Sequence, residues 1–106
     1  MYATLRSYVT SDADRVRELV VDEVLPNLHD TSGLIAFYLI ASGDGKLSSL
    51  TLAESEAAVE RSNAQAAEWV RERFAGLVAG PPDVLCGEIV LEHRWKPSAA
   101  EERGTS

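Results

Sequence analysis

The residues with the clearest chemical potential lie on a helix predicted over residues 55–77. At about 100° per residue, Asn63 falls inside the apolar stripe of this helix and Phe74 lies on the same side. Ser62 and Trp69 border the stripe. A buried amide without hydrogen-bond partners costs about 1–3 kcal/mol, so Asn63 should face a partner, water or a ligand. The pattern predicts a catalytic Asn63, with Ser62, Trp69 and Phe74 binding the substrate. The alternative is that Asn63 bonds a backbone group and Trp69 belongs to the core.

A carboxylate has a similar position on the helix predicted over residues 12–25. On a helical wheel, Glu23 falls between Leu19 and Val20 in the apolar stripe. Burial would raise the pKa of this carboxyl group unless it is paired, which suits a catalytic general base for a phenol or quinol proton. The alternative is that Pro26 lifts the end of the helix and admits water to Glu23.

Two further polar groups lie on predicted strands. The hydroxyl of Tyr38 is predicted to bind a carbonyl or phenol of the substrate. The alternative is a tyrosine that caps a sheet face, since a shift of one residue in register reverses its direction. Arg6 and Glu88 lie on strands expected to be neighbours and are predicted to form a cross-strand ion pair.

Composition excludes several classes of partner. The chain has 106 residues and a formal net charge of −7 without a cluster of Lys and Arg, which disfavours nucleic acid and anionic membranes. His29 and His93 are far apart, and no metal-ligand spacing is present. We therefore expect no metal and no cofactor. The single Cys86 and the lack of a long apolar run indicate a cytoplasmic protein.

The hydrophobic pattern predicts six elements in the order β-α-β-β-α-β. The expected strands cover residues 2–9, 34–41, 46–53 and 84–93, and the expected helices cover residues 12–25 and 55–77. Gly43 and Gly45 are expected to give positive φ in a hairpin, and the run 80–82 to end the second helix. This order predicts an α+β, ferredoxin-like βαββαβ fold with a four-stranded antiparallel sheet. Residues 1–95 form the single domain, and residues 96–106 are predicted to be a disordered tail.

One strand requires cover on both faces. Residues 34–41, "LIAFYLIA", are apolar at every position except the hydroxyl of Tyr38, whereas a strand with one wet face alternates. Two helices cover only one face of a four-stranded sheet. The simplest cover for the other face is the same sheet from a second subunit, which predicts a homodimer. Trp95 is a candidate interface anchor.

Three stretches of this chain resemble a known family. They are "SGLIAFYLI", the hairpin "SGDGK" and the strand end, cap and Ala-rich helix "LAESEAAVERSNAQAAEWV". Over roughly residues 2–93 the chain resembles the dimeric α+β barrel superfamily, and within it the antibiotic-biosynthesis-monooxygenase-like group. The resemblance implies two sheets packed face to face in a homodimeric α+β barrel. It also implies a pocket within each subunit between the sheet and the two helices.

The resemblance also bears on activity. A heme-degrading branch of the superfamily uses an Asn early in the first strand, a Trp on the second helix and a His about ten residues later. This chain has Ser7 and Tyr8 in the first strand, Trp69 on the helix and Ala79 in place of the His, so heme degradation is disfavoured.

The polyketide-oxygenase branch places Asn, Trp and Tyr side chains around its substrate, and Asn63, Trp69 and Tyr38 are compatible with that set. We therefore expect a cofactor-independent, monooxygenase-like enzyme that acts on an apolar aromatic or quinol-type small molecule. The alternative is a non-catalytic protein that binds a hydrophobic small molecule, or a purely structural homodimer.

Overall fold

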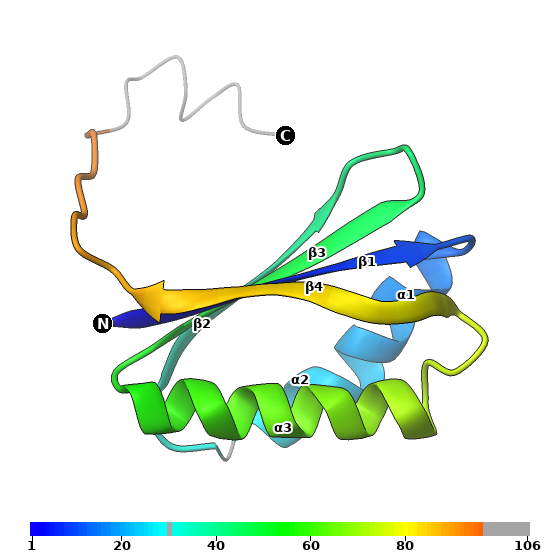
Figure 1. Ribbon diagram of the computed structural model, residues 1–106, viewed down its shortest axis with the longest axis horizontal. Helices are drawn as coiled ribbons and strands as arrows, with labels where there is room; N and C mark the ends of the chain where they lie inside the picture. Colours follow the sequence, from blue (N-terminus) through cyan, green and yellow to red (C-terminus); the bar gives the residue numbers. More distant parts are fainter. Residues whose placement is uncertain (30, 97–106) are drawn as a thin grey trace.

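The fold is a four-stranded antiparallel sheet with all helices on one side. The computed structural model describes residues 1–29 and 31–96. Its elements are β1 (Tyr2–Thr10), α1 (Ala13–Leu19), the π-helical η1 (Val20–Val24), α2 (Leu25–Leu28), β2 (Leu34–Ala41), β3 (Lys46–Ala53), α3 (Glu56–Glu72) and β4 (Val78–Glu88). The strand order is β2-β3-β1-β4, and the helices lie below the sheet in Figure 1. The predicted ferredoxin-like βαββαβ fold is confirmed.

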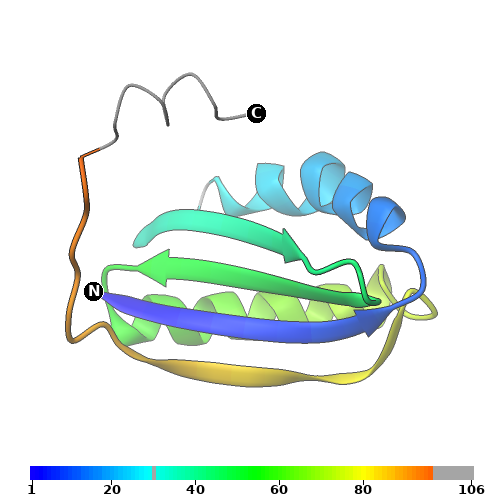
Figure 2. The same ribbon diagram turned by 90° about the horizontal axis from the view of Figure 1, so that it is seen from above.

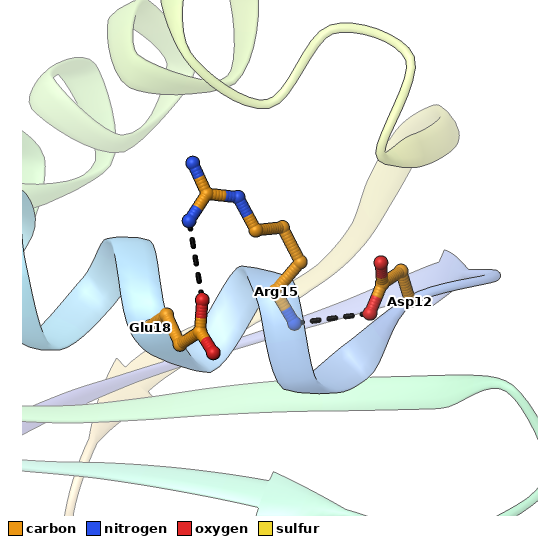
Figure 3. A network of polar contacts seen from close by, with 3 residues as sticks. All are labelled: Asp12, Arg15 and Glu18. Carbon is orange, nitrogen blue, oxygen red and sulfur yellow. Dashed lines mark hydrogen bonds and ion pairs between the residues drawn. The ribbon is translucent and has the colours of Figure 1, made fainter.

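The first helix begins after Asp12 and continues beyond the predicted end. Asp12 Oδ1 accepts a hydrogen bond of 3.1 Å from the backbone N–H of Arg15, whose guanidinium pairs with Glu18 at 3.1 Å (Figure 3). The helical run continues through η1 and α2 to Leu28, three residues past Leu25, which was predicted to end it. Pro26 does not stop the helix, because it directly follows the π-helical turn η1, in which the N–H of Leu25 donates to the carbonyl of Val20 and the regular α-helical bonding is already interrupted.

The second helix is shorter than expected and the last strand begins earlier. Ser55 caps α3 by accepting a hydrogen bond of 3.2 Å from the backbone N–H of Ala58. The helix ends at Glu72, and β4 covers Val78–Glu88, so the predicted boundaries at residues 77, 84 and 93 were wrong. The run 80–82, expected to end the helix, lies inside β4. Two prolines are tolerated there because β4 is an edge strand bonded only to β1, with a register shift opposite Ser7 and Val9.

The sheet has a covered face and an open face. In β3, Leu47, Ser49, Thr51 and Ala53 are buried, and the intervening residues are more exposed. Directly opposite residues on antiparallel strands share a face. The covered face therefore includes Arg6, which pairs with Ser49. Within residues 1–29 and 31–96, no helix covers the opposite face (Figure 2).

The core lies between the covered face and the helices. Its largest cluster joins the first helical run, β3 and the turn after α3, through Val16, Val20, Val24, Leu47 and Phe74. The hairpin between β2 and β3 is as predicted, with φ of +83° at Gly43 and +84° at Gly45. In the described part of the chain, no helix is long and apolar enough to cross a membrane.

The end of the domain differs from the expectation. Residues 89–96 follow β4 without strand structure, although the backbone N–H of Ile89 donates to the carbonyl of Met1 at 2.9 Å. The limits predicted for the domain, residues 1–95, stay a prediction. The predicted disordered tail, residues 96–106, lies outside the described residues from position 97 onward.

Candidate functional site

A cavity lies between the covered face of the sheet and the helices. The centre of a water molecule can reach about 50 Å³ of it, and one water requires roughly 10–15 Å³ by this measure. The cavity is therefore suited to a small molecule. Its wall is mostly aliphatic and aromatic; the apolar members are Val16, Val20, Val24, Leu28, Phe37, Leu39, Leu47, Ala66, Trp69, Val70, Phe74 and Val78. Four polar residues complete the wall: Arg6, Tyr8, Ser49 and Ser62.

Among the described residues, Arg6 is the only charged one in the cavity wall. The residue is 6% exposed, and no carboxylate in residues 1–29 and 31–96 forms an ion pair with it. Its Nη1 donates to Asn63 Oδ1, while its Nε has no hydrogen-bond partner. Burial lowers the pKa of Arg6, and the neighbouring Tyr8 opposes this shift. An arginine retains its charge in proteins, so the cavity wall is positive at this point.

Two hydroxyl groups extend the polar wall on the same face. Ser49 is directly opposite Arg6 across the β1–β3 ladder, and its buried Oγ has no hydrogen-bond partner. Tyr8 is two residues along β1 from Arg6 and therefore points to the same side. Burial raises the pKa of the Tyr8 phenol, and Arg6 opposes that shift. Tyr8 thus keeps its proton at neutral pH and is a donor rather than a base.

Asn63 is tied to the sheet and does not line the cavity. Its Oδ1 accepts a hydrogen bond of 2.9 Å from Thr4 Oγ1 as well as the one from Arg6. The sequence predicted that this amide needs a partner, and the structure supplies two side chains of β1. Neither a backbone group nor the cavity fills that role. Asn63 therefore positions Arg6. Its predicted role as a catalytic residue is unsupported by the structure, because Asn63 does not line the cavity.

Three predicted binding residues come together in the cavity wall. Ser62, Trp69 and Phe74 all line it, although Phe74 lies beyond the end of α3 rather than on the helix. Their contact with a substrate stays a prediction. Trp69 and Phe74 supply aromatic surface, and Ser62 supplies a hydroxyl.

Two other predicted site residues lie elsewhere. Tyr38 is opposite Leu50 on the open face and is 53% exposed, so it does not reach the cavity of this subunit. Glu23 also lies outside the wall, where its carboxylate pairs with Arg73 at 3.4 Å. The register of β2 places Tyr38 on the open face. The position of Glu23 in the π-helical turn and its ion pair with Arg73 keep it outside the cavity wall.

The sequence reading missed Arg6, Tyr8 and Ser49 as site residues. It assigned Arg6 to an ion pair with Glu88, but Glu88 is opposite Tyr2 and Arg6 is opposite Val84. A usable signal was present in β1, where polar or amphipathic residues recur at every second position from Tyr2 to Thr10. That alternation does not by itself say which set is covered by the helices.

Comparisons with solved structures identify the fold. A protein of unknown function from Nitrosomonas europaea, NE2512, is 17% identical with a TM-score of 0.70, over 91% of this chain and 95% of that chain. A monooxygenase from the gene ActVA-Orf6 of Streptomyces coelicolor, in complex with nanaomycin D, is 21% identical with a TM-score of 0.69, over 92% of each chain. The heme-degrader MhuD of Mycobacterium tuberculosis, with two hemes bound in its active site, is 16% identical with a TM-score of 0.67, over 89% of this chain and 100% of that chain.

The chain shares the fold of these structures, which include a monooxygenase and putative antibiotic biosynthesis monooxygenases. The resemblance seen in the sequence is confirmed at the level of the fold. No protein-family model and no curated protein sequence matches the chain. Because a shared fold hosts many activities, function has to be argued from the cavity itself.

Proposed function

We propose that this protein is a cofactor-independent, monooxygenase-like enzyme that acts on an aromatic or quinol-type small molecule held between the sheet and the helices. The observation that carries the proposal is the cavity, whose apolar and aromatic wall is interrupted at one place by polar groups. Flat, oxygen-bearing rings match this combination, because the ring packs on Trp69 and Phe74 while its oxygen meets Arg6 or Ser49.

Two solved structures of the same fold support a small-molecule ligand. One contains nanaomycin D and the other contains two hemes. The cavity of this chain has room for only a few water molecules. A small ring system therefore suits it better than a group as large as heme.

A binding protein without turnover is the second candidate. The cavity wall holds no carboxylate, imidazole or thiol among the described residues, and Tyr8 retains its proton. A substrate that depends on a protein base would find none there. Turnover would require a ring that is itself acidic and electron-rich, whereas simple binding has no such requirement.

A second copy of the chain is the proposed partner, and it pairs through the open face. One row of this face is apolar across all four strands: Tyr38 on β2, Leu50 on β3, Leu5 on β1 and Leu85 on β4 are directly opposite one another. Leu85 is 71% exposed. An apolar sheet face is stabilised when it packs on an equivalent face. A cytoplasmic location is also proposed, because the free Cys86 is exposed.

Oxygen consumption tests the proposed activity. Purified protein is supplied with single-ring and two-ring quinols and no added reductant, and Trp69→Ala is compared with Glu68→Ala. Trp69 lines the cavity, whereas Glu68 is exposed on the same helix and outside the cavity. We expect turnover in the wild type, at least a tenfold loss in kcat/KM for Trp69→Ala, and less than a twofold change for Glu68→Ala.

Circular dichroism and sedimentation establish that both variants keep the fold and oligomeric state of the wild type. Absence of oxygen consumption with every quinol, combined with a thermal shift by one of them, would replace the enzyme with the binding protein. Equal activity in the two variants would show that catalysis occurs outside this cavity.

A further inference from the structure

The cavity wall contains a positive charge with no negative partner. Arg6 is 6% exposed, and no carboxylate of the described residues pairs with it. A buried charge is costly unless it is paired and fully hydrogen-bonded. Arg6 meets neither condition, since its polar neighbours Asn63 and Tyr8 are both neutral and its Nε has no hydrogen-bond partner.

A second unpaired donor lies beside the first. Ser49 is 6% exposed, its Oγ lacks a partner, and it is directly opposite Arg6 in the β1–β3 ladder. Opposite residues of such a ladder have Cβ atoms roughly 4.5–5.5 Å apart. Both residues line the cavity. One oxyanion in the cavity could therefore accept from the guanidinium and the hydroxyl together.

We infer that Arg6 and Ser49 form an oxyanion site, and that the ligand of the cavity is a small aromatic ring carrying one carboxylate or phenolate. The inference rests on the proposed function only in taking that ligand to be the substrate. The oxyanion site also explains how the cavity could work without a protein base, because a substrate that is bound as its anion has already lost its proton. The guanidinium favours the ionised form of a phenol and fixes which edge of the ring faces the sheet.

Asn63 and Thr4 are the positioning residues of this site. Asn63 Oδ1 accepts from Arg6 Nη1 on one side and from Thr4 Oγ1 on the other. Thr4 is on the same covered face of β1 and is fully buried. The amide therefore fixes one end of the guanidinium and leaves its remaining donors for the ligand.

Calorimetric titration with benzoate and benzamide tests the site, because these molecules share a shape and differ in charge. We expect benzoate to bind the wild type at least tenfold more tightly than benzamide. In Arg6→Met, benzoate should lose at least tenfold in affinity while benzamide changes little. Arg17→Met is the matched control, since Arg17 is exposed and outside this cavity, and it should bind as the wild type does.

Two further measurements separate an oxyanion site from a structural arginine. Without ligand, Arg6→Met should unfold in urea at the same concentration as the wild type or a higher one, because an unpaired buried charge has been removed. Arg6→Lys should keep the preference for benzoate over benzamide with weaker binding, since the charge is retained and the fork is lost. A phenolate is distinguished from a carboxylate with 4-nitrophenol, whose visible absorbance reports its ionisation. The wild type should lower the pKa of the bound phenol, and Arg6→Met should not.

The inference is overturned if benzoate and benzamide bind alike, if benzoate does not bind, or if benzoate binds Arg6→Met as tightly as the wild type. Its failure is separable from failure of the proposed function. Arg6-dependent binding of benzoate without oxygen consumption from any quinol retains the oxyanion site and removes the enzyme. If Arg6→Met and the wild type oxidise quinols equally well, the enzyme is retained and the oxyanion site is removed.

Discussion

The two faces of the sheet are built in the opposite way from an ordinary soluble sheet. On the covered face, one row across the strands reads Leu39, Ser49, Arg6 and Val84, so that its two central residues are polar and buried. On the open face, the next row reads Tyr38, Leu50, Leu5 and Leu85. In these two rows, the central polar groups lie inside and the apolar groups lie outside.

This inversion indicates that each face has a partner that the single chain does not provide. Buried polar groups carry a cost unless they are paired, and an exposed apolar row has no benefit in water. We propose that a ligand polar at one edge completes the covered face and that a second apolar sheet covers the open face. On this proposal the same strands serve binding on one side and assembly on the other.

The largest effect should follow from a charge placed on the open face. Leu85→Glu is expected to weaken the homodimer by roughly a hundredfold or more, because twofold symmetry places two carboxylates in the interface. The control is Val84→Glu, whose side chain lies on the covered face opposite Arg6. Its dimer should dissociate no more than that of the wild type. Sedimentation equilibrium measures both. A monomeric wild type, or equal effects of the two variants, would end the assignment of the open face to dimerisation.

An intermediate effect is expected from the amide that supports the covered face. Asn63→Ala removes the acceptor of both Thr4 and Arg6 and should lower the free energy of unfolding by about 2 kcal/mol, because buried donors lose their partner. The matched control is Gln65→Ala on the same helix. The buried Oε1 of Gln65 has no partner, so its loss should cost less than about 0.5 kcal/mol. Urea unfolding that ranks the two variants in the reverse order would remove Asn63 from the support of Arg6.

The smallest effect is expected outside both faces. Glu23→Gln breaks an ion pair of 3.4 Å with Arg73 in which both side chains are at least one-third exposed. Such pairs contribute about 0–1 kcal/mol, and we expect a loss below about 0.5 kcal/mol together with unchanged oxygen consumption. Arg73→Gln is the control for the pair. A tenfold fall in kcat for Glu23→Gln alone would restore Glu23 as the general base that its position on the helical wheel predicted.

The sequence supported the fold more fully than the site. Caps at Asp12 and Ser55 and the hairpin glycines were predictable, because each depends on a few neighbouring residues. Ser62 and Trp69 were also placed correctly on the covered side of α3, since helical periodicity fixes which positions share a face. Tyr38 was not placed correctly. Strand periodicity shows that side chains alternate between the two faces, but it does not show which alternate residues face the helices.

The order of elements and their approximate positions were thus determined by the sequence alone, through hydrophobic period and turn chemistry, whereas the need for cover on both faces of the sheet stays a prediction. Only the tertiary structure decided that β4 begins at Val78, since the edge position that tolerates its prolines is a property of the whole sheet. The tertiary structure also decided that Arg6 faces the cavity opposite Ser49, without an ion pair to any carboxylate of the described residues. That outcome depends on the register between strands separated by some forty residues in the chain, and no local pattern encodes it.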